Sequence, residues 1–427
     1  MNEVNIESVL ARDIKSNRSG ACYDLNIEFK LLIIANKITF NFGDGSGGAS
    51  FNYDLNNYVI KNGQYFEIQN CIFKDNVEVT INNPISNIKW VDCIFEKNLI
   101  IKSPQSVEKL HKISSFILEG GKVNNLVIGN IIANFKFYIN PQEKKYNSSI
   151  EITNLKINDS KFIENFKLHH AIVNKLEIEN VDFEQNADFF KSVFHEGVVE
   201  EDIKEKTKQN DIGFKAINFK KLALFGDTEF HKKLIFKYVT FEGHNHFKSA
   251  KLHKGLDLEY TNVQKEINFY GIEILDKATT SQETYRIIKN QFEKLNNKIE
   301  ANKYHALELE QHRKDIKTKI FKDFKSFFKF APDGLVSLSH WASSNHSSNY
   351  LLALFWIFIV SFCTNGFLGN TTIDFSFNGW NNLFKYINIL SKIEDFNDSY
   401  VAMTLNKVSL GYLYYQFLTA VRKDTRK

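Results

Sequence analysis

The chain has 427 residues, with 54 Lys and Arg against 50 Asp and Glu. This length is enough for two or three domains, and a formal net charge of +4 excludes a strongly polybasic or polyacidic protein. The charge is unevenly distributed. Residues 1–278 hold 35 basic and 37 acidic side chains, whereas residues 279–427 hold 19 and 13, so the basic excess is C-terminal.

Residues 1–50 are expected to form an N-terminal cap. They contain a short helical piece, a strand from Leu25 to Phe42 and a glycine-rich turn at Gly43–Gly48. No Lys-Ser or Lys-Thr follows these glycines, so a phosphate-binding loop is not indicated. The first residues lack the basic region and apolar run of a secretory signal, which predicts a cytosolic location for the following domain.

A repeat of two alternating steps is clearest in the last part of residues 51–278. Large apolar residues recur there at steps of five and six in turn: Phe214, Phe219, Phe225, Phe230, Phe236, Phe241, Phe247, Leu252, Leu258, Val263, Phe269 and Ile274. A small or β-branched residue often precedes them by two positions, as in Ala223, Thr228, Val239, Ala250 and Thr261. Neither a helix nor a flat strand has this period. The large residues and the small residues that precede them are both expected to point inward.

A second pattern gives the same repeat length. The segment Ile68–Val79 recurs as Trp90–Ile101, at the distance of four such steps, and looser copies begin at Ile157 and Ile178. A fixed period of this size indicates a repeat architecture.

A five-residue unit with two inward positions resembles the repeat unit of the pentapeptide-repeat family. The resemblance implies a mainly β fold, namely a right-handed quadrilateral β-helix over residues 51–278, and the repeat predicts about 22 residues per coil. We expect an α-helical linker and a two-helix transmembrane hairpin to follow it.

Three less regular stretches, residues 103–121, 141–149 and 194–213, are expected to interrupt the coils as loops.

Two cysteines, Cys71 and Cys93, precede inward phenylalanines one coil apart, and we expect buried thiols that a cytosolic location keeps reduced. Asparagines recur at equivalent positions and are expected to stack as ladders at the corners. They are Asn76, Asn98, Asn165 and Asn186.

Residues 279–330 change to a helical period and are expected to form a cap and linker that covers the C-terminal end of the β-helix. The apolar stripe comprises Tyr285, Ile288, Phe292, Leu295, Ile299, Asn302, Ala306 and Leu309. Its steps of three and four predict either one continuous helix or a hairpin broken at Asn296-Asn297. Thr284–Glu310 also resembles a linker of membrane-attached pentapeptide-repeat proteins, some of which carry an ion-channel module. Arg313–Lys329 holds seven basic residues between apolar ones, which predicts a basic juxtamembrane helix.

Residues 331–427 are expected to form a membrane domain with spans near residues 350–369 and 400–421. The first stretch, Tyr350–Gly369, is apolar for about 20 residues, the length of a transmembrane helix; a buried helix of a soluble protein is the alternative. The second contains one charge, Lys407. The basic flanks 311–330 and 422–427 contrast with residues 364–406, which hold two Lys and four acids. This contrast predicts that both termini are cytoplasmic.

No catalytic residue and no cofactor site is predicted, because the sequence has no nucleophile-elbow, zinc-protease, P-loop or dinucleotide motif. His231 and His253 each follow an inward residue and lie one repeat apart, so their side chains are expected to stack about 5 Å apart on one face. Two histidines without a third ligand make a poor metal site. For them, and for His244 and His246 at a corner, no metal is predicted.

The sequence therefore favours a non-enzymatic scaffold, anchored in a bacterial inner membrane, that presents a protein-interaction surface in the cytosol. Membrane lipid and an unidentified protein are the expected partners, and an oligomer is left open. Nucleic acid is not an expected partner, because a net charge of −2 over residues 1–278 does not mimic DNA and the coils lack a basic, aromatic stripe. The alternative is a subunit of an ion channel or small-solute pore, with Gly379–Leu390 as a re-entrant or interfacial helix, although no carbonyl selectivity motif is present.

Overall fold

The computed structural model describes residues 26–27, 32–34, 38–42, 65–69, 71–81, 87–102, 115–140, 149–197, 210–321, 324–369 and 377–424. The chain divides into two compact units, Met1–Thr280 and Ser281–Lys427. The N-terminal helical piece and the glycine-rich turn expected at Gly43–Gly48 lie outside the described residues.

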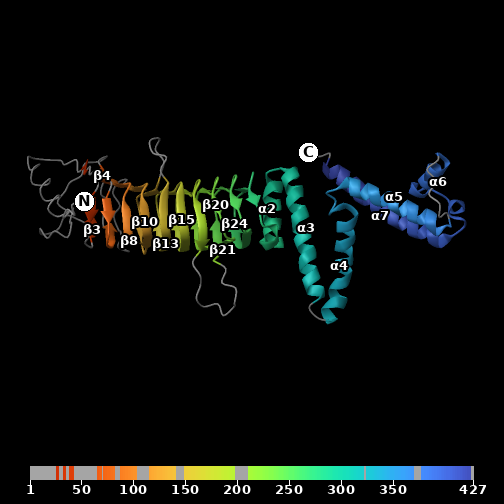
Figure 1. The fold of residues 1–427 in the computed structure, drawn as a ribbon, viewed down its shortest axis with the longest axis horizontal. Helices are drawn as coiled ribbons and strands as arrows, with labels where there is room; N and C mark the ends of the chain where they lie inside the picture. The colour runs from red at the N-terminus through yellow and green to blue at the C-terminus, as the bar shows by residue number, and fades with distance from the viewer. Residues whose placement is uncertain are drawn as a thin grey trace, which may run out of the picture. The chain divides into compact units, whose positions relative to one another are not determined.

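The first unit, the β-strand unit, consists of two sheets in which every described strand pairing is parallel (Figure 1). One sheet runs β1 (Asn26–Ile27), β4 (Tyr65–Gln69), β7 (Asn87–Val91), β9 (Ser115–Glu119), β12 (Lys136–Ile139), β14 (Phe166–Leu168), β16 (Ala187–Asp188), β19 (Ala223–Leu224), β22 (Asn245–His246) and β25 (Ile267–Asn268). The main row of the other runs β2 (Leu32–Ile34), β5 (Cys71–Phe73), β8 (Ile94–Lys102), β10 (Lys122–Gly129), β13 (Ile150–Phe162), β15 (Ala171–Phe183), β17 (Val193–Gly197), β20 (Glu229–Phe230), β23 (Lys251–Leu252) and β26 (Glu273–Ile274). Joined to that row are β3 (Ile38–Phe42), β6 (Val77–Ile81), β11 (Ile132–Ala133), β18 (Ile212–Phe219), β21 (Leu234–Phe241) and β24 (Leu256–Val263).

The chain passes from one sheet to the other and back within each repeat, and the strands pair with equivalent strands of the neighbouring repeats. Parallel strands joined in this way cannot be a hairpin meander. The arrangement fits a parallel β-helix, in which each turn of the chain forms one coil.

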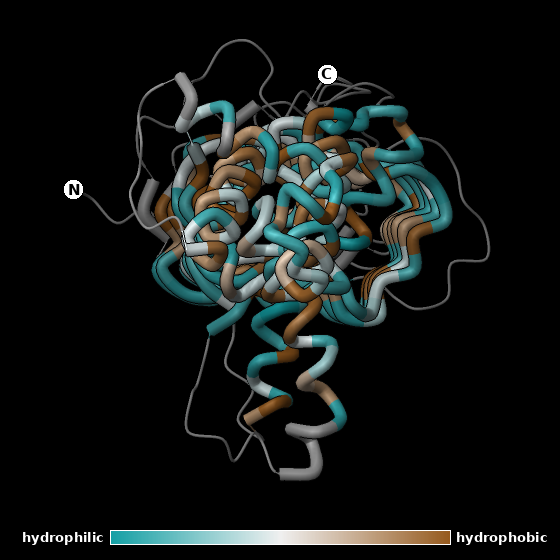
Figure 2. Tube along the Cα trace, turned by 90° about the vertical axis from the view of Figure 1, so that its right-hand side faces the viewer, coloured by the Kyte–Doolittle hydropathy of each residue, from teal (hydrophilic) through white to brown (hydrophobic). Residues whose placement is uncertain are grey.

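The strand register confirms the predicted repeat length. Ile68 pairs with Trp90, and Phe73 pairs with Phe95, so the interval between paired residues equals the interval between the two sequence copies. Phe162 pairs with Phe183, an interval shorter by one, as the looser copies predict. Figure 2, which looks along the stack, shows residues of similar hydropathy superimposed from coil to coil.

The interior of the β-strand unit is built from stacked phenylalanines. Phe219 stacks on Phe241 with ring centroids 5.3 Å apart, and Phe225 stacks on Phe247 at 4.6 Å. Eleven of the twelve predicted inward residues from Phe214 to Ile274 are buried, and Val263 is half-buried. Val263 lies in β24, the last strand of its row, whose strand partner among the described residues is β21. Each buried phenylalanine contributes about 2 kcal/mol through loss of apolar surface from water.

The corners of the coils also repeat. Asp227, Ser249 and Gly271 lie at equivalent positions, each two residues before strands β20, β23 and β26, which pair in that order. Their φ angles are 51°, 58° and 71°. This left-handed conformation is strained for most side chains and is tolerated best by Gly, Asn and Asp. Recurring strain at one corner is maintained because the stacked strands on either side fix the backbone.

The stack differs from the expected domain limits at its N-terminal end. The single strand expected over Leu25–Phe42 is instead three strands, β1, β2 and β3, which pair with β4, β5 and β6. This segment therefore adds strands to the stack. Most of the three predicted interruptions lies outside the described residues, but β9, β17 and β18 occupy their ends.

The second unit, the helical unit, contains α2 (Gln282–Lys294), α3 (Lys298–Ile320), α4 (Phe324–Ser344), α5 (Tyr350–Phe367), α6 (Phe377–Ile387), the 3₁₀ turn η3 (Ile393–Phe396) and α7 (Tyr400–Asp424). Another 3₁₀ turn, η2 (Lys277–Thr279), ends the β-strand unit. The basic helix expected over Arg313–Lys329 is not continuous, because α3 ends at Ile320 and α4 begins at Phe324.

The structure resolves the two alternatives for the helical stripe in favour of a hairpin. Asn296 has a φ of 55°, and the Asn297 side chain accepts a hydrogen bond from the Glu300 N–H at the start of α3. Asparagine suits both a left-handed turn and a helix N-cap. Across the hairpin, Phe292 stacks on Tyr304 with centroids 5.5 Å apart.

The expected pair of transmembrane helices is wrong. Among the described residues one helix, α5, has the length and apolar composition to cross a membrane. The second predicted span does form α7, but it contains Asn406, Lys407 and Gln416. Antiparallel packing of α5 on α7 brings Ile357 against Leu410 and Leu413.

Candidate functional site

The histidines predicted to stack do so on the outer surface of the β-strand unit. Strand pairing of Phe230 with Leu252 aligns the next residues, His231 and His253. Their imidazole rings stack with centroids 4.5 Å apart and planes 12° apart. The predicted contact between these two side chains is confirmed.

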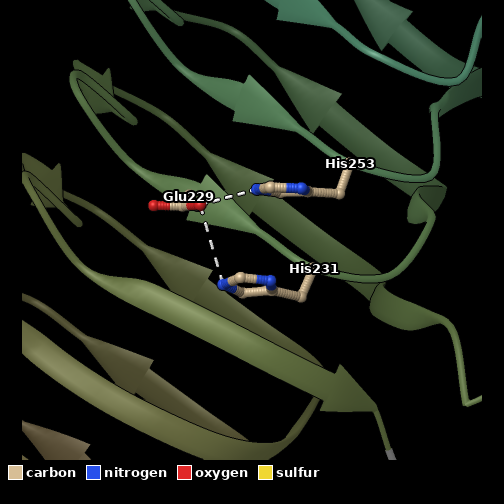
Figure 3. A group of neighbouring side chains, drawn as sticks. All are labelled: Glu229, His231 and His253. Carbon is tan, nitrogen blue, oxygen red and sulfur yellow. Dashed lines mark hydrogen bonds and ion pairs between the residues drawn. The ribbon is translucent and has the colours of Figure 1, made fainter.

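A third side chain, Glu229, joins these histidines. It lies two positions before His231, so both project from the same outer face while Phe230 points inward. Glu229 Oε1 lies 2.6 Å from His253 Nε2 and 3.7 Å from His231 Nε2. Figure 3 shows the carboxylate facing both rings, which come from neighbouring coils.

The stack extends to a third ring. His195 stacks on His231 with centroids 4.6 Å apart, because Phe194 pairs with Phe230. His195 and Glu229 were not predicted from the sequence. The signal for Glu229 was its alternation with His231, whereas the signal for His195 was hidden because the interval from Phe194 to Phe230 is longer than one regular repeat.

The surroundings lower the pKa values of two of these groups, His231 and Glu229. Burial, together with the neighbouring His253 and His195, lowers the pKa of His231. The hydrogen bond from His253 lowers the pKa of Glu229, with a smaller contribution from the charge of His231. An ionised carboxylate therefore faces an imidazole that favours its neutral form.

Among the described residues, Glu229, His231 and His253 form the one group of His, Cys, Asp or Glu whose three donor atoms all lie within 4.8 Å of one another. The prediction that no metal binds here assumed two histidines alone, and Glu229 supplies the missing third donor. Two other histidines of the β-strand unit each have a single carboxylate partner. His244 Nδ1 lies 3.4 Å from Glu266 Oε2, and His169 Nε2 lies 2.8 Å from Asp188 Oδ2.

The predicted corner ladders of asparagine are present and larger than expected. Asn76 Oδ1 accepts from the Asn98 N–H at 3.2 Å, and the ladder continues through Asn125 and Asn154 at 2.9 and 2.6 Å. A separate corner joins Asn165 to Asn186. Cys93 is a buried thiol, as predicted, and donates to Val91 O. The side chain of Cys71 lies outside the described residues.

The outer surface also carries charge pairs in register. Lys156 pairs with Glu177 at 2.6 Å, and Lys122 pairs with Glu151 at 3.2 Å. In each case the two residues are directly opposite each other on adjacent strands. Stacked opposite charges leave little net field along these faces.

The helical unit has an unusual distribution of side chains around α5. Its buried residues are Ala353, Ile357, Ser361 and Thr364. Large apolar residues are exposed instead, including Leu351 at 60% and Phe355 at 55%. Only 22% of the most apolar window of α5 is buried, which is unlike the core helix of a soluble domain.

The amphipathic helix predicted at Gly379–Leu390 forms α6, but it ends at Ile387 and does not bury one continuous face. Leu383 is buried, whereas Trp380 and Phe384 are 40% and 52% exposed. Leu390 lies beyond the helix and is 83% exposed.

No family model, curated protein or solved structure matches this chain. The resemblance to pentapeptide-repeat proteins therefore stays a proposal.

Proposed function

We propose that this protein is a non-enzymatic scaffold, attached to a bacterial inner membrane, whose β-strand unit presents a protein-binding surface in the cytosol. The observation that carries the proposal is the in-register stack of parallel strands, in which each outward side chain has a fixed neighbour one coil away. A coil cannot fold alone, since ordering each backbone residue costs about 1–2 kcal/mol. Stacking makes the array rigid, and a rigid array of outward side chains suits binding.

The finer architecture belongs to the same proposal. A right-handed coil of the pentapeptide type is supported by the 5/6 alternation of large inward residues and by small residues such as Ala223 and Ala250, which are fully buried. The corner ladders of asparagine add a reason for the coils to stack in one register.

The surface of the stack favours a protein partner over nucleic acid. The paired Lys and Glu side chains form neither a basic stripe nor an acidic one. Tyr238 and Tyr260 are instead 65% and 61% exposed, and their rings lie 5.9 Å apart on adjacent strands. Exposed tyrosines are enriched at the energetic centres of protein interfaces, so we place the partner over this pair.

Membrane attachment is supported by the side chains of α5. Three of the four buried residues of α5, namely Ala353, Ser361 and Thr364, are small or polar, whereas large apolar residues of the helix are exposed, which is the pattern of helices in lipid. The outer face of α7 is also apolar, with Leu405, Val408 and Leu418 each more than 60% exposed. Burial of such surfaces in an apolar surrounding is favourable by about 25 cal/mol per Å².

The test places a photo-crosslinking amino acid at position 260 in the full-length protein and irradiates intact cells. We expect one defined protein adduct in the membrane fraction, and its loss when Tyr238→Ala is added. The same amino acid at Lys156 serves as the control. Equal adducts at both positions, or recovery of the wild-type chain in the soluble fraction, would contradict the proposal.

The pore alternative is tested separately with purified protein in liposomes. An ion flux that scales with the amount of protein would replace the scaffold by a pore subunit. Within the described residues of one chain, α5 and α7 pack on each other through Ile357 and Leu410.

A further inference from the structure

We propose that Glu229, His231 and His253 form a binding site for one divalent transition-metal ion, which clamps two adjacent coils of the β-strand unit. This inference goes beyond the proposed scaffold function and does not depend on it. Its starting point is the convergence of three donor atoms from two coils (Figure 3).

The backbone positions the donors. Glu229 and His231 flank the buried Phe230, and His253 follows the buried Leu252 on the next coil. Because Phe230 and Leu252 are paired in the sheet, the distance between the two histidines is set by strand spacing. The ring of His231 also stacks on that of His195.

The distances fit a metal ion after small side-chain rotations. Zinc binds nitrogen and carboxylate oxygen at about 2.0–2.2 Å, which puts donors of a tetrahedral site about 3.4 Å apart. The His231–Glu229 distance of 3.7 Å is already close to this value, and the 2.6 Å His253–Glu229 contact must widen. All three side chains are about one-third exposed, so they have room to rotate and an ion can enter from solvent.

The donor set selects the class of ion. Two imidazole nitrogens with one carboxylate suit Zn²⁺, Ni²⁺ or Cu²⁺, whereas Mg²⁺ and Ca²⁺ prefer oxygen ligands alone. Three protein ligands leave a fourth position for water. The ion takes the position between His253 Nε2 and Glu229 Oε1, and a neutral His253 that offers Nε2 as a ligand carries its proton on Nδ1.

Other histidines of the β-strand unit offer a comparison. His244 and His169 each have one carboxylate partner, but within the described residues neither belongs to a group of three donors. A single imidazole and a single carboxylate bind such ions weakly, so His244 is the matched control.

The test is isothermal titration of ZnCl₂ into the full-length, detergent-solubilised protein, prepared without a histidine tag and stripped with a chelator. We expect one saturable site. The variants H253A and E229Q should each weaken Zn²⁺ binding by tenfold or more, because loss of a direct ligand costs at least as much as the roughly 10–100-fold loss seen for outer-shell partners. H244A should bind as the wild type does, and MgCl₂ should give no saturable heat.

A second readout separates loss of a ligand from loss of the fold. Cu²⁺ bound to the wild type should show nitrogen hyperfine structure from two imidazoles in its electron paramagnetic resonance spectrum, and from one in H231A or H253A. Thermal unfolding of the metal-free variants should stay within a few degrees of the wild type. Absence of saturable Zn²⁺ binding, or equal binding by wild type, H253A and E229Q, would overturn the proposal.

Discussion

The β-strand unit and the helical unit place their polar groups in opposite ways. In the β-strand unit, Phe225 and Phe241 are fully buried, and paired charges such as Lys156 and Glu177 lie outside. In the helical unit, Asn406 and Gln416 of α7 are 2% exposed. The outer faces of these helices are apolar. The first distribution is that of a water-soluble domain, and the second is the observation on which the proposed membrane attachment rests.

Some of the buried polar groups in the helical unit are hydrogen-bonded to groups of neighbouring helices, whereas Asn406 Oδ1 is buried without a hydrogen-bond partner among the described residues. Asn406 Nδ2 donates to Thr364 Oγ1 at 2.9 Å and to Tyr386 O at 3.2 Å. Gln416 Oε1 accepts from Ser344 Oγ and Ser347 Oγ, both at 2.9 Å. Side-chain hydrogen bonds therefore contribute to the contacts of α7 with its neighbours, whereas the side chains inside the coils interact mainly through stacked aromatic rings.

The largest expected effect comes from putting a charge into the aromatic stack. Phe241→Asp should unfold the β-strand unit, because a buried carboxylate without a partner costs several kcal/mol and Phe241 is fully buried against Phe219. Circular dichroism during thermal unfolding measures the loss. Lys237→Asp, at an exposed position of the same strand, is the control and should change stability by less than about 1 kcal/mol. Equal destabilisation by both changes would contradict an interior filled by Phe241.

In the β-strand unit an outward charge should be tolerated, whereas on the exposed face of α5 it should weaken membrane attachment. Phe355→Lys replaces a residue of α5 that is 55% exposed, a change that a water-facing helix tolerates. In lipid it costs about 3 kcal/mol near the centre of a span. We expect a smaller share of Phe355→Lys protein to remain in membranes after alkaline carbonate extraction. Glu164→Lys on the β-strand unit should extract as the wild type does. Unchanged retention of the Phe355→Lys variant would show that this face does not contact lipid.

The ion cluster between α2 and α3 predicts a pH dependence. Burial alone would raise the pKa of Glu308, but hydrogen bonds from Arg286, Lys289 and His305 outweigh it and lower the pKa below the ordinary value of 4.5. A lowered folded-state pKa means that the stabilising contribution is complete above the unfolded-state pKa. It is lost as pH falls through the folded-state value.

The variant Glu308→Gln tests whether the stability contributed by Glu308 is lost as the pH falls. At pH 7 it should destabilise the hairpin by about 1–3 kcal/mol, since charged hydrogen bonds are lost, and amide hydrogen exchange of α2 and α3 should speed up. The difference between wild type and variant should shrink as pH falls from about 5 towards 3. Exposed Glu293→Gln is the matched change on the same hairpin. A difference that stays constant with pH would exclude the ionised Glu308 as its source.

Sequence periodicity correctly predicted the structural features that recur at a constant interval along the chain. The inward phenylalanines and the His231–His253 contact follow from one constant interval. Periodicity missed His195, because residues 198–209 lengthen that turn of the chain, and it missed Asn125 and Asn154, which lie 27 and 29 residues along their ladder. Additional residues between two strands change the interval in sequence without changing which strands pair.

The remaining differences arise from tertiary context. Glu229 was missed because its role depends on a histidine of the next coil. The second membrane span was predicted from a stretch with a single charge, Lys407. The absence of further charges does not reveal that the uncharged polar residues Asn406 and Gln416 lie on the buried side of the helix. Whether Asn296-Asn297 breaks the helical stripe was undecided, because these residues interrupt a helix only when both sides can pack against each other.

The smallest effect is expected at the asparagine ladder, which sharpens the contrast between aromatic packing and polar stacking. Asn125 Nδ2 donates to Asn98 Oδ1, and Asn125 Oδ1 accepts from Asn154 Nδ2. Asn125→Ala removes both bonds at a half-buried corner where water can replace part of them, so the loss should be about 1 kcal/mol. For a unit of this size, that corresponds to a fall of about 2–4 °C in Tm. Exposed Asn262→Ala should leave Tm within about 1 °C. A larger fall for Asn125→Ala, comparable to that of Phe241→Asp, would mean that the ladder, rather than the phenylalanine interior, holds the coils in register.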